Sequence, residues 1–200
     1  MQQTYDKLAK YYDGAFAPLE QFFLARLRAE TLSHLPANAK ILEIGAGTGA
    51  NFRFYPTCDH AIASEISLKM IDIAKDKAND IELVQANAEH LPFPANHFDG
   101  AFATLVFCSV PSPETAFGEV IRVLKPGGRF VLLEHVRPDG VLGYAFDLLN
   151  VLTVAVVNDH FNRRTARTVE KAGLRLVSVK KILFGIVNLI VCEVDKYHED

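Results

Sequence analysis

Residues 41–50 read ILEIGAGTGA, an apolar run that leads directly into a glycine-rich turn. Short apolar runs of this kind are typical of buried parallel strands. Glycine permits a tight turn and the close approach of a ligand, because it has no Cβ. The stretch therefore predicts a strand that is followed by a turn, with a ligand site at the carboxyl end of the strand.

The strand pattern recurs along the chain and alternates with helical patterns. Apolar runs that predict buried strands cover 39–44, 60–64, 81–85, 98–103 and 129–134. Ser67 and Ser112-Pro113 are typical helix starts, and the helix after Pro113 is expected to stop at the Lys-Pro-Gly-Gly of 125–128. This alternation predicts right-handed crossovers and a doubly wound parallel sheet with helices on both faces.

The two ends of the chain add further elements. Apolar residues at helical spacing over 19–35 predict an amphipathic helix ended by Pro36. A last helix is expected from Asn162 to Gly173, before strands at 174–183 and 186–194 that a two-residue connection makes antiparallel. The expected fold is α/β: a Rossmann-like sheet of seven strands, five parallel and two in a C-terminal antiparallel hairpin, with an N-terminal helical extension.

The length of 200 residues and the 50% hydrophobic content suit a single domain with a buried core. We divide it into a helical extension at 1–37, a cofactor-binding core at 38–138, a segment at 139–160, and a terminal helix and hairpin at 161–200. The segment at 139–160 is rich in Val, Leu and Phe, which predicts a lid over the substrate, a membrane contact or ordinary core.

The net charge and the cysteines limit the kinds of partner that the protein is expected to bind. A net charge of −3 argues against a purely electrostatic nucleic-acid binder, and three widely spaced cysteines do not suggest a metal site. The first 16 residues lack the apolar core of a signal peptide, so a cytoplasmic location is expected. Residues 160–181 contain seven basic residues and one acidic residue, which indicates either a solvated surface or peripheral contact with a membrane.

The glycine turn fits two cofactor classes. Gly45, Gly47 and Ala50 match the dinucleotide pattern of NAD enzymes, whereas Glu43 favours the methionyl ammonium of S-adenosylmethionine. Glu65 ends the second strand and could accept both ribose hydroxyls of either cofactor. An NAD-dependent oxidoreductase stays an alternative, although no tyrosine precedes a lysine by four positions. A non-enzymatic module that binds a cofactor is another.

Four motifs in this order and spacing resemble class I S-adenosylmethionine-dependent methyltransferases, in the branch with the ubiquinone and menaquinone C-methyltransferases. They are LEIGAGTG at 42–49, Glu65, NAEHLPFPANHFD at 87–99 and VLKPGG at 123–128. GTGANFRFYP at 47–56, TLVFCSV at 104–110, LEHV at 133–136 and residues 162–165 are similar to the alkyl-thiol methyltransferases. Small bacterial phosphatidylethanolamine N-methyltransferases share the same outline.

The resemblance implies S-adenosylmethionine as the cofactor, with Glu43 near its ammonium and Glu65 on its ribose. Asn87 stands where the family commonly has Asp, and an amide adds no charge to the adenine contact. The cofactor-binding residues that the resemblance implies are Tyr12, Glu43, Gly45, Gly47, Gly49, Glu65, Ile66, Met70, Asn87, Ala88, Thr104 and Leu105.

Methyl transfer needs a nucleophile in line with the S–CH₃ bond, and a general base only where the nucleophile starts protonated. His135, His160 and Asp159 are the candidate catalytic residues, and no metal is expected. Further candidates for contact with the substrate are Cys108, Glu134, Arg137, Asn158 and Asn162. The expected acceptor is small and apolar or amphiphilic: a thiol or sulfide sulfur, or a phospholipid amine. A quinone-type carbon is the alternative.

Overall fold

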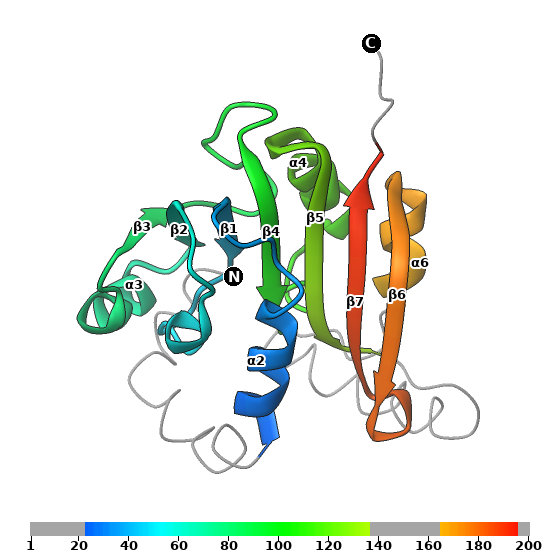
Figure 1. Cartoon of the computed structure of the whole chain (residues 1–200), viewed down its shortest axis with the longest axis horizontal. Helices are drawn as coiled ribbons and strands as arrows, with labels where there is room; N and C mark the ends of the chain where they lie inside the picture. The colour runs from blue at the N-terminus through cyan, green and yellow to red at the C-terminus, as the bar shows by residue number, and fades with distance from the viewer. Residues whose placement is uncertain (1–22, 137–164, 196–200) are drawn as a thin grey trace.

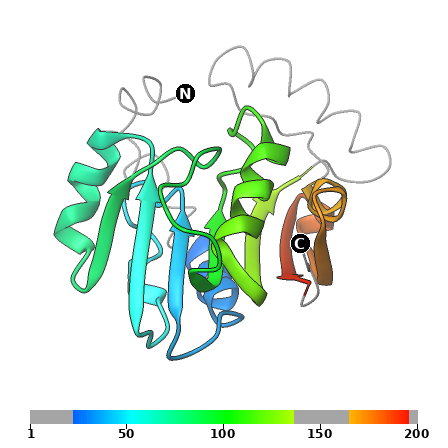
Figure 2. The ribbon, with the colours of Figure 1, turned by 90° about the horizontal axis from the view of Figure 1, so that it is seen from above.

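The computed structural model describes residues 23–136 and 165–195, which form one seven-stranded sheet (Figure 1). The strands are β1 (Lys40–Ile44), β2 (His60–Glu65), β3 (Ile81–Gln85), β4 (Phe98–Thr104), β5 (Leu124–His135), β6 (Leu174–Ile182) and β7 (Val187–Val194). Their order is β3-β2-β1-β4-β5-β7-β6, and Figure 2 shows them side by side. β1 to β5 are parallel, whereas β7 is antiparallel to β5 and β6, which confirms the expected architecture.

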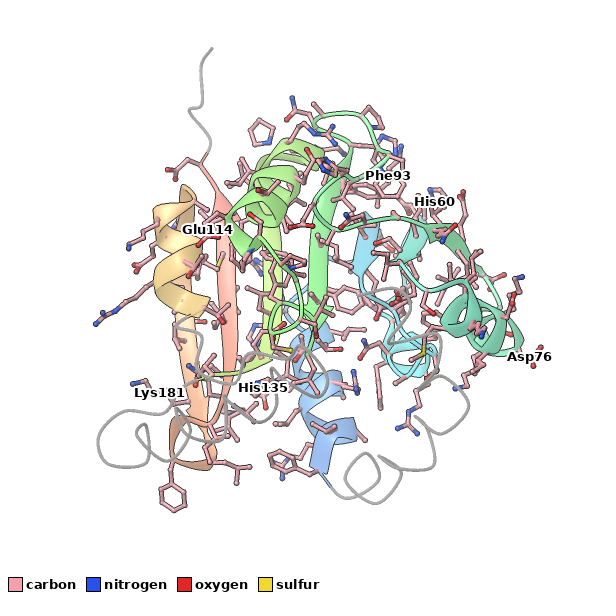
Figure 3. The ribbon with its side chains drawn as sticks, turned by 180° about the vertical axis from the view of Figure 1, so that it is seen from behind. His60, Asp76, Phe93, Glu114, His135 and Lys181 are labelled. Carbon is pink, nitrogen blue, oxygen red and sulfur yellow. The ribbon has the colours of Figure 1, made fainter. Side chains whose placement is uncertain are left out.

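Helices cover both faces of this sheet. They are α2 (Ala25–Leu32), α3 (Leu68–Ala74), α4 (Pro113–Val123) and α6 (Thr165–Lys171), with 3-10 turns η2 (Phe52–Phe54), η3 (Lys75–Lys77) and η4 (Leu183–Gly185). In Figure 1, α2 lies in front of the strands; in Figure 3, seen from behind, α4 and α6 lie in front. The described residues thus form three layers, helix, sheet and helix.

Alternation along the buried strands divides the core between these faces. Ile41 packs with Leu27 and Leu32 of α2, whereas the next residue, Leu42, belongs to the cluster with Phe117 of α4. The face toward α4 is rich in aromatic residues, and the Phe117 ring stacks on that of Phe107 with centroids 4.4 Å apart. Strands buried on both faces are apolar throughout, which is why their sequences read as continuous apolar runs.

The two predicted helix starts differ in detail. Ser67 caps α3, because its hydroxyl accepts a hydrogen bond from the Met70 N–H at 3.2 Å. Ser112 occupies the N-cap position of α4, but its side chain makes no capping bond and instead lies 2.7 Å from the Thr115 hydroxyl. The expectation of a serine cap is therefore confirmed for α3 and corrected for α4, whose first turn begins with Pro113.

The Lys-Pro-Gly-Gly segment ends α4 as predicted, but β5 begins earlier than Arg129. Phe98 pairs with Leu124 and Gly100 with Arg129, so four residues of β5 bulge out of register with β4. Gly127 has a φ of 76°, and a Cβ on Gly128 would lie 2.7 Å from the Lys125 carbonyl oxygen. The two glycines permit the bulge.

Several predictions fall partly or wholly outside the described residues. They include the start of the helix expected at 19–35, the segment at 139–160 and the cap assigned to Asn162. The described part of that first helix ends at Leu32, ahead of Pro36. Among the helices of residues 23–136 and 165–195, none is long and apolar enough to cross a membrane.

Candidate active site

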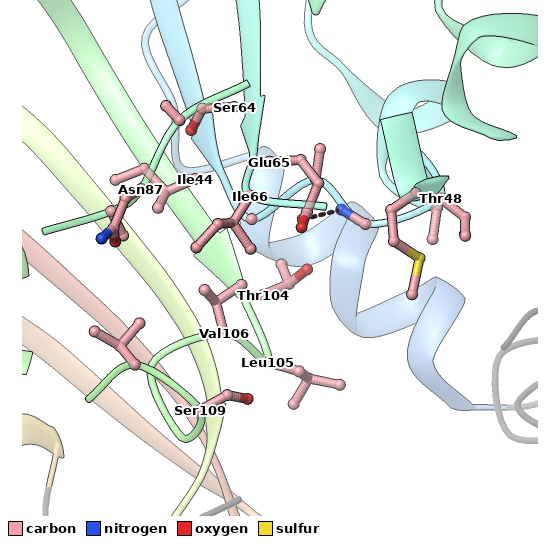
Figure 4. Close-up of a pocket in the computed structure, with 18 of the residues that line it drawn as sticks. Ile44, Thr48, Ser64, Glu65, Ile66, Asn87, Thr104, Leu105, Val106 and Ser109 are labelled. Atoms are coloured by element: carbon pink, nitrogen blue, oxygen red, sulfur yellow. Dashed lines mark hydrogen bonds between the residues drawn. The ribbon is translucent and has the colours of Figure 1, made fainter. Parts of the chain in front are cut away.

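A pocket opens at the carboxyl ends of β1, β2 and β4 (Figure 4). It holds about 870 Å³ of space between protein atoms, open solvent at its mouth included. Its lining is Arg28, Ile44, Gly45, Ala46, Gly47, Thr48, Ala50, Ser64, Glu65, Ile66, Met70, Ala86, Asn87, Ala88, Thr104, Leu105, Val106, Ser109 and Val110. Open α/β sheets bind their ligands at this edge.

Two glycines of the turn line the pocket, and each is needed for a different reason. Gly47 has a φ of 56° and a Cβ there would have no atom within 4 Å, so its missing side chain leaves space for a ligand. A Cβ on Gly45 would lie 2.6 Å from Val106, so this glycine lets the loop after β4 pack closely. Gly49, which we expected at the cofactor, does not line the pocket, because Phe52 covers it.

Glu65 is the last residue of β2, lines the pocket and is only 7% exposed. Its carboxylate accepts the Gly47 N–H at Oε2 and the Ser67 N–H at Oε1, both at 2.9 Å. These two bonds fix the side chain between the glycine turn and the start of α3. A carboxylate has about four lone-pair sites, so Glu65 can also accept hydrogen bonds from the hydroxyl groups of a bound sugar.

All four residues expected around adenine line the pocket. Ile66 and Met70 follow β2, and Asn87 and Ala88 follow β3. The Asn87 Oδ1 accepts the Glu89 N–H at 3.0 Å, which orients the amide. Its Nδ2 is a donor, so this side chain can address an acceptor on a base edge.

The loop after β4 forms the opposite wall. Leu105 has a φ of 58°, a left-handed conformation that costs a non-glycine residue about 1–3 kcal/mol. The buried Glu134 supports this loop, since its Oε1 accepts the N–H groups of Val106 and Phe107 at 2.9 and 3.0 Å. Glu134 is fully buried, so it positions the pocket wall, which corrects the expectation that it contacts the substrate. Cys108 is also buried, at 3% exposure.

Four polar residues of the pocket were not predicted from the sequence: Arg28, Thr48, Ser64 and Ser109. Arg28 of α2 lines the pocket, and its Nη1 donates to Thr104 Oγ1 at 2.6 Å and to Asn51 Oδ1 at 2.9 Å. The Asn51 Nδ2 donates in turn to Thr104 Oγ1 at 2.8 Å. A charged residue at helical spacing between Leu24 and Leu35, on the apolar face of α2, was the available signal for Arg28.

Glu43 lies behind this network and does not line the pocket. It is fully buried, and it accepts hydrogen bonds from Asn51 Nδ2 at 2.6 Å and from the Tyr55 hydroxyl at 2.5 Å. Burial raises its pKa to about 7, although both bonds and the charge of Arg28 act to lower it. Glu43 was expected to orient the ammonium, directly or through water. In the structure it does not line the pocket but accepts from Asn51, which also donates to Thr104 of the pocket.

Of the three candidate catalytic residues, His135 is the one that falls within the described residues. His135 ends β5 and is half-buried, but it does not line the pocket. Tyr12, Asp159 and His160 lie outside the described residues, as do Arg137, Asn158 and Asn162. Within 23–136 and 165–195, no group of three or more His, Cys, Asp or Glu side chains could hold a metal ion.

The fold and the pocket define a Rossmann-like methyltransferase of class I. Comparison with known proteins agrees: residues 42–132 match the methyltransferase domain family, and the chain belongs to the S-adenosylmethionine-dependent methyltransferases of this class. S-adenosylmethionine is its methyl donor. The NAD-dependent oxidoreductase and the non-enzymatic module are thereby excluded.

Two curated relatives are similar over most of the chain. The ubiquinone/menaquinone biosynthesis C-methyltransferase UbiE of Stutzerimonas stutzeri is 33% identical over 75% of this chain and 70% of its own length. The enzyme of the same name from Pseudomonas savastanoi is 30% identical over 79% of this chain and 73% of its own. An S-adenosylmethionine-dependent methyltransferase from Thermotoga maritima shares the fold, with a TM-score of 0.76, 22% identity and 96% and 99% coverage.

Proposed function

We propose that the pocket holds S-adenosylmethionine along its length, with Glu65 on the ribose hydroxyls. Ile66, Met70, Asn87 and Ala88 surround the adenine in this arrangement. The methionyl group lies along Gly45 and Gly47 and passes Thr104 and Leu105. The fit rests on two features of the pocket, the buried carboxylate of Glu65 and the space that a Cβ on Gly47 would fill.

Arg28 supplies a contact that the sequence did not predict. Its guanidinium is held at the pocket by Thr104 and Asn51, next to the glycine turn. We assign it to the methionyl carboxylate, because a guanidinium pairs well with a carboxylate and the other described pocket residues are neutral or acidic. In this assignment Glu43 helps to position the guanidinium through Asn51.

When bound, the cofactor supplies a methyl group on a positively charged sulfur. The chain has to orient the acceptor and exclude water. Leu105, Val106 and Val110 give the wall beside β4 an apolar surface suited to both tasks. His135, and with it His160 and Asp159, are the candidate bases for an acceptor that starts protonated.

The acceptor that we favour is a carbon of a quinone-type ring. The names of the two similar curated enzymes carry this proposal, since both are C-methyltransferases of ubiquinone and menaquinone biosynthesis. A thiol sulfur is the second candidate, because GTGANFRFYP at 47–56 is similar to the alkyl-thiol methyltransferases. Both acceptors are apolar and fit the wall beside β4.

An acceptor screen tests the proposal. The purified chain is incubated with S-adenosylmethionine and, in separate reactions, a short-chain quinol, an alkyl thiol and phosphatidylethanolamine vesicles. Mass spectrometry then follows the methyl group. We expect a ring-methylated quinol. Methylation of the thiol alone would replace the quinone-type acceptor by the second candidate, and methylation of the lipid amine alone would contradict both.

A further inference from the structure

The turn between β6 and β7 presents two large apolar side chains to solvent. Phe184 is 90% exposed and Leu183 is 48% exposed. Exposed apolar residues are common on protein surfaces, but an almost fully exposed phenylalanine beside an exposed leucine adds nothing to the core. We call Leu183 and Phe184 the hairpin tip.

The backbone of the hairpin tip is also unfavourable for these residues. Leu183 and Phe184 have φ values of 49° and 56°, in the left-handed region. Glycine, and to a lesser degree Asn, adopts this conformation readily, whereas bulky side chains are strained there. The turn thus keeps two side chains that neither packing nor turn geometry favours, which indicates a role outside folding.

Basic residues lie directly beside the hairpin tip. Lys181 pairs with Asn188 one position before the last pair of the hairpin, and it is exposed. Lys180 is also exposed, and its Nζ lies 2.6 Å from Glu30 of α2, an ion pair that links the hairpin to the helix of Arg28. Arg175 lies at the opposite end of the hairpin, where it pairs with Glu193. The tip is therefore an apolar apex with an adjacent positive charge.

The hairpin tip lies at the same edge of the sheet as the pocket. β6 is antiparallel to β7, and β7 is antiparallel to β5, so β6 runs in the direction of the parallel strands. The turn after β6 therefore lies at the carboxyl ends of the parallel strands (Figure 1), where the residues that line the pocket also lie. Figure 3 places Lys181 and His135 toward this same end of the molecule.

We infer that the hairpin tip inserts into an anionic lipid bilayer and brings the pocket edge to the membrane surface. The apolar side chains of the hairpin tip suit the acyl chains of a bilayer, and the lysine beside them suits the anionic headgroups above those chains. A bilayer also suits a protruding tip better than a protein partner does, because it needs no complementary groove. The inference deepens the proposed function, on which it rests: an apolar acceptor is dissolved in the membrane.

A tryptophan at the tip reports insertion directly, because the chain has no tryptophan of its own. Phe184→Trp is titrated with vesicles of phosphatidylcholine and phosphatidylglycerol. Its emission should move to shorter wavelength on these vesicles. Val177→Trp is the matched control, since Val177 is an exposed apolar residue in the middle of β6, 46% exposed, and its emission should stay unchanged. Equal shifts for both variants, or none for Phe184→Trp, would overturn the inference.

Flotation with the same vesicles tests whether the tip is required. Leu183→Asn combined with Phe184→Gly removes the apolar apex and supplies the residues that the turn prefers, so thermal stability should be kept or increased. We expect at least a tenfold loss of vesicle binding. Lys181→Gln should weaken binding by about fivefold on anionic vesicles, the effect of one lysine near such a surface. Unchanged binding of the double variant would overturn the inference.

Two controls separate this inference from the proposed function. Vesicle binding is measured without cofactor or acceptor, so it does not depend on the reaction. Methyl transfer to a water-soluble short-chain acceptor should be the same in the parent and the double variant. If that transfer is absent while Phe184→Trp inserts, the proposed acceptor is wrong and the membrane contact stands. A blue shift of Phe184→Trp with protein concentration alone would identify a second copy of the chain as the partner and overturn the inference.

Discussion

Arg28 carries its charge on a side chain that is only 7% exposed. Its Nη1 donates to Thr104 Oγ1 and to Asn51 Oδ1, and these two bonds hold the guanidinium at the pocket. Its charge also acts on the buried Glu43, whose pKa it lowers and which accepts a hydrogen bond from Asn51. At the scale of single residues, the pocket therefore holds a cation that a ligand carboxylate would complement.

Replacement of Arg28 by Met should weaken the binding of S-adenosylmethionine by about 10- to 100-fold, since a hydrogen bond to a charged group contributes about 1.5–3 kcal/mol. Calorimetry on parent and variant measures this. Arg26→Met is the matched control, because Arg26 is an exposed residue of the same helix. Decarboxylated S-adenosylmethionine should bind the parent and Arg28→Met with equal affinity. If Arg28→Met loses the same affinity for both ligands, Arg28 acts only on the structure of the protein.

Glu43 should make the stability of the protein depend on pH. Burial raises its folded pKa to about 7, from 4.5 for an exposed carboxyl. The Glu43 carboxyl therefore binds a proton more tightly in the folded state than in the unfolded state. Its contribution to the free energy of unfolding is fully present below about pH 4.5 and is lost as the pH rises through about 7. The free energy of unfolding should fall over this window by up to about 3 kcal/mol more in the parent than in Glu43→Gln.

Denaturant unfolding at about pH 5 and pH 8 measures this difference. The variant removes the titration but keeps a side chain of the same length, so other ionisable groups contribute equally to both proteins. If parent and variant lose the same stability between the two pH values, Glu43 is already ionised at about pH 5 and the assignment fails.

At the scale of elements, Ser67 and Ser112 occupy the same position before α3 and α4, so their alanine variants can be compared directly. Ser67→Ala should destabilise the protein by about 1 kcal/mol, because it removes the hydroxyl that accepts the Met70 N–H. Ser112→Ala should cost less, since Ser112 occupies the same helix position without a capping bond. Thermal or denaturant unfolding compares them, and a larger loss for Ser112→Ala would contradict the capping geometry.

The elements themselves could be predicted because their causes are local. The strand positions within the described residues agree with the predicted ranges apart from the start of β5, and the Lys-Pro-Gly-Gly segment predicted the end of α4. The connection between β6 and β7 was expected to have two residues but has four, because Leu183 and Ile186 lie in the turn. The bulge at the start of β5 could not be predicted in the same way. It depends on where β4 pairs with β5, which is set by residues far apart in the sequence.

The site was predictable where a motif lies next to a strand end. Gly47, Glu65 and Asn87 follow β1, β2 and β3, or end them, and the sheet brings these ends together. Arg28 reaches the pocket from another layer of the fold, through a contact with Thr104 that is 76 residues away in sequence. Glu43 looked like a binding residue in the sequence, but in the structure it is fully buried and is not among the residues that line the pocket.

At the scale of the whole molecule, one edge of the sheet combines the pocket with the hairpin tip. The crossovers between parallel strands place the cofactor residues at the carboxyl ends, and the direction of β6 places Leu183 and Phe184 at the same edge. A substrate that arrives from a membrane would thus reach the cofactor without crossing the protein. This arrangement follows from the topology, because β7 runs opposite to the other strands of the described sheet, which all end at that edge.

The central claim is that this pocket binds the cofactor with Glu65 on its ribose. The most direct test is a calorimetric cycle of S-adenosylhomocysteine and its 2′-deoxy analogue against the parent and Glu65→Gln. We expect one site per chain, and removal of the hydroxyl should weaken binding to the parent by about tenfold or more. The same removal should have much less effect on Glu65→Gln. An equal penalty in both proteins, or no binding to the parent, would contradict the claim.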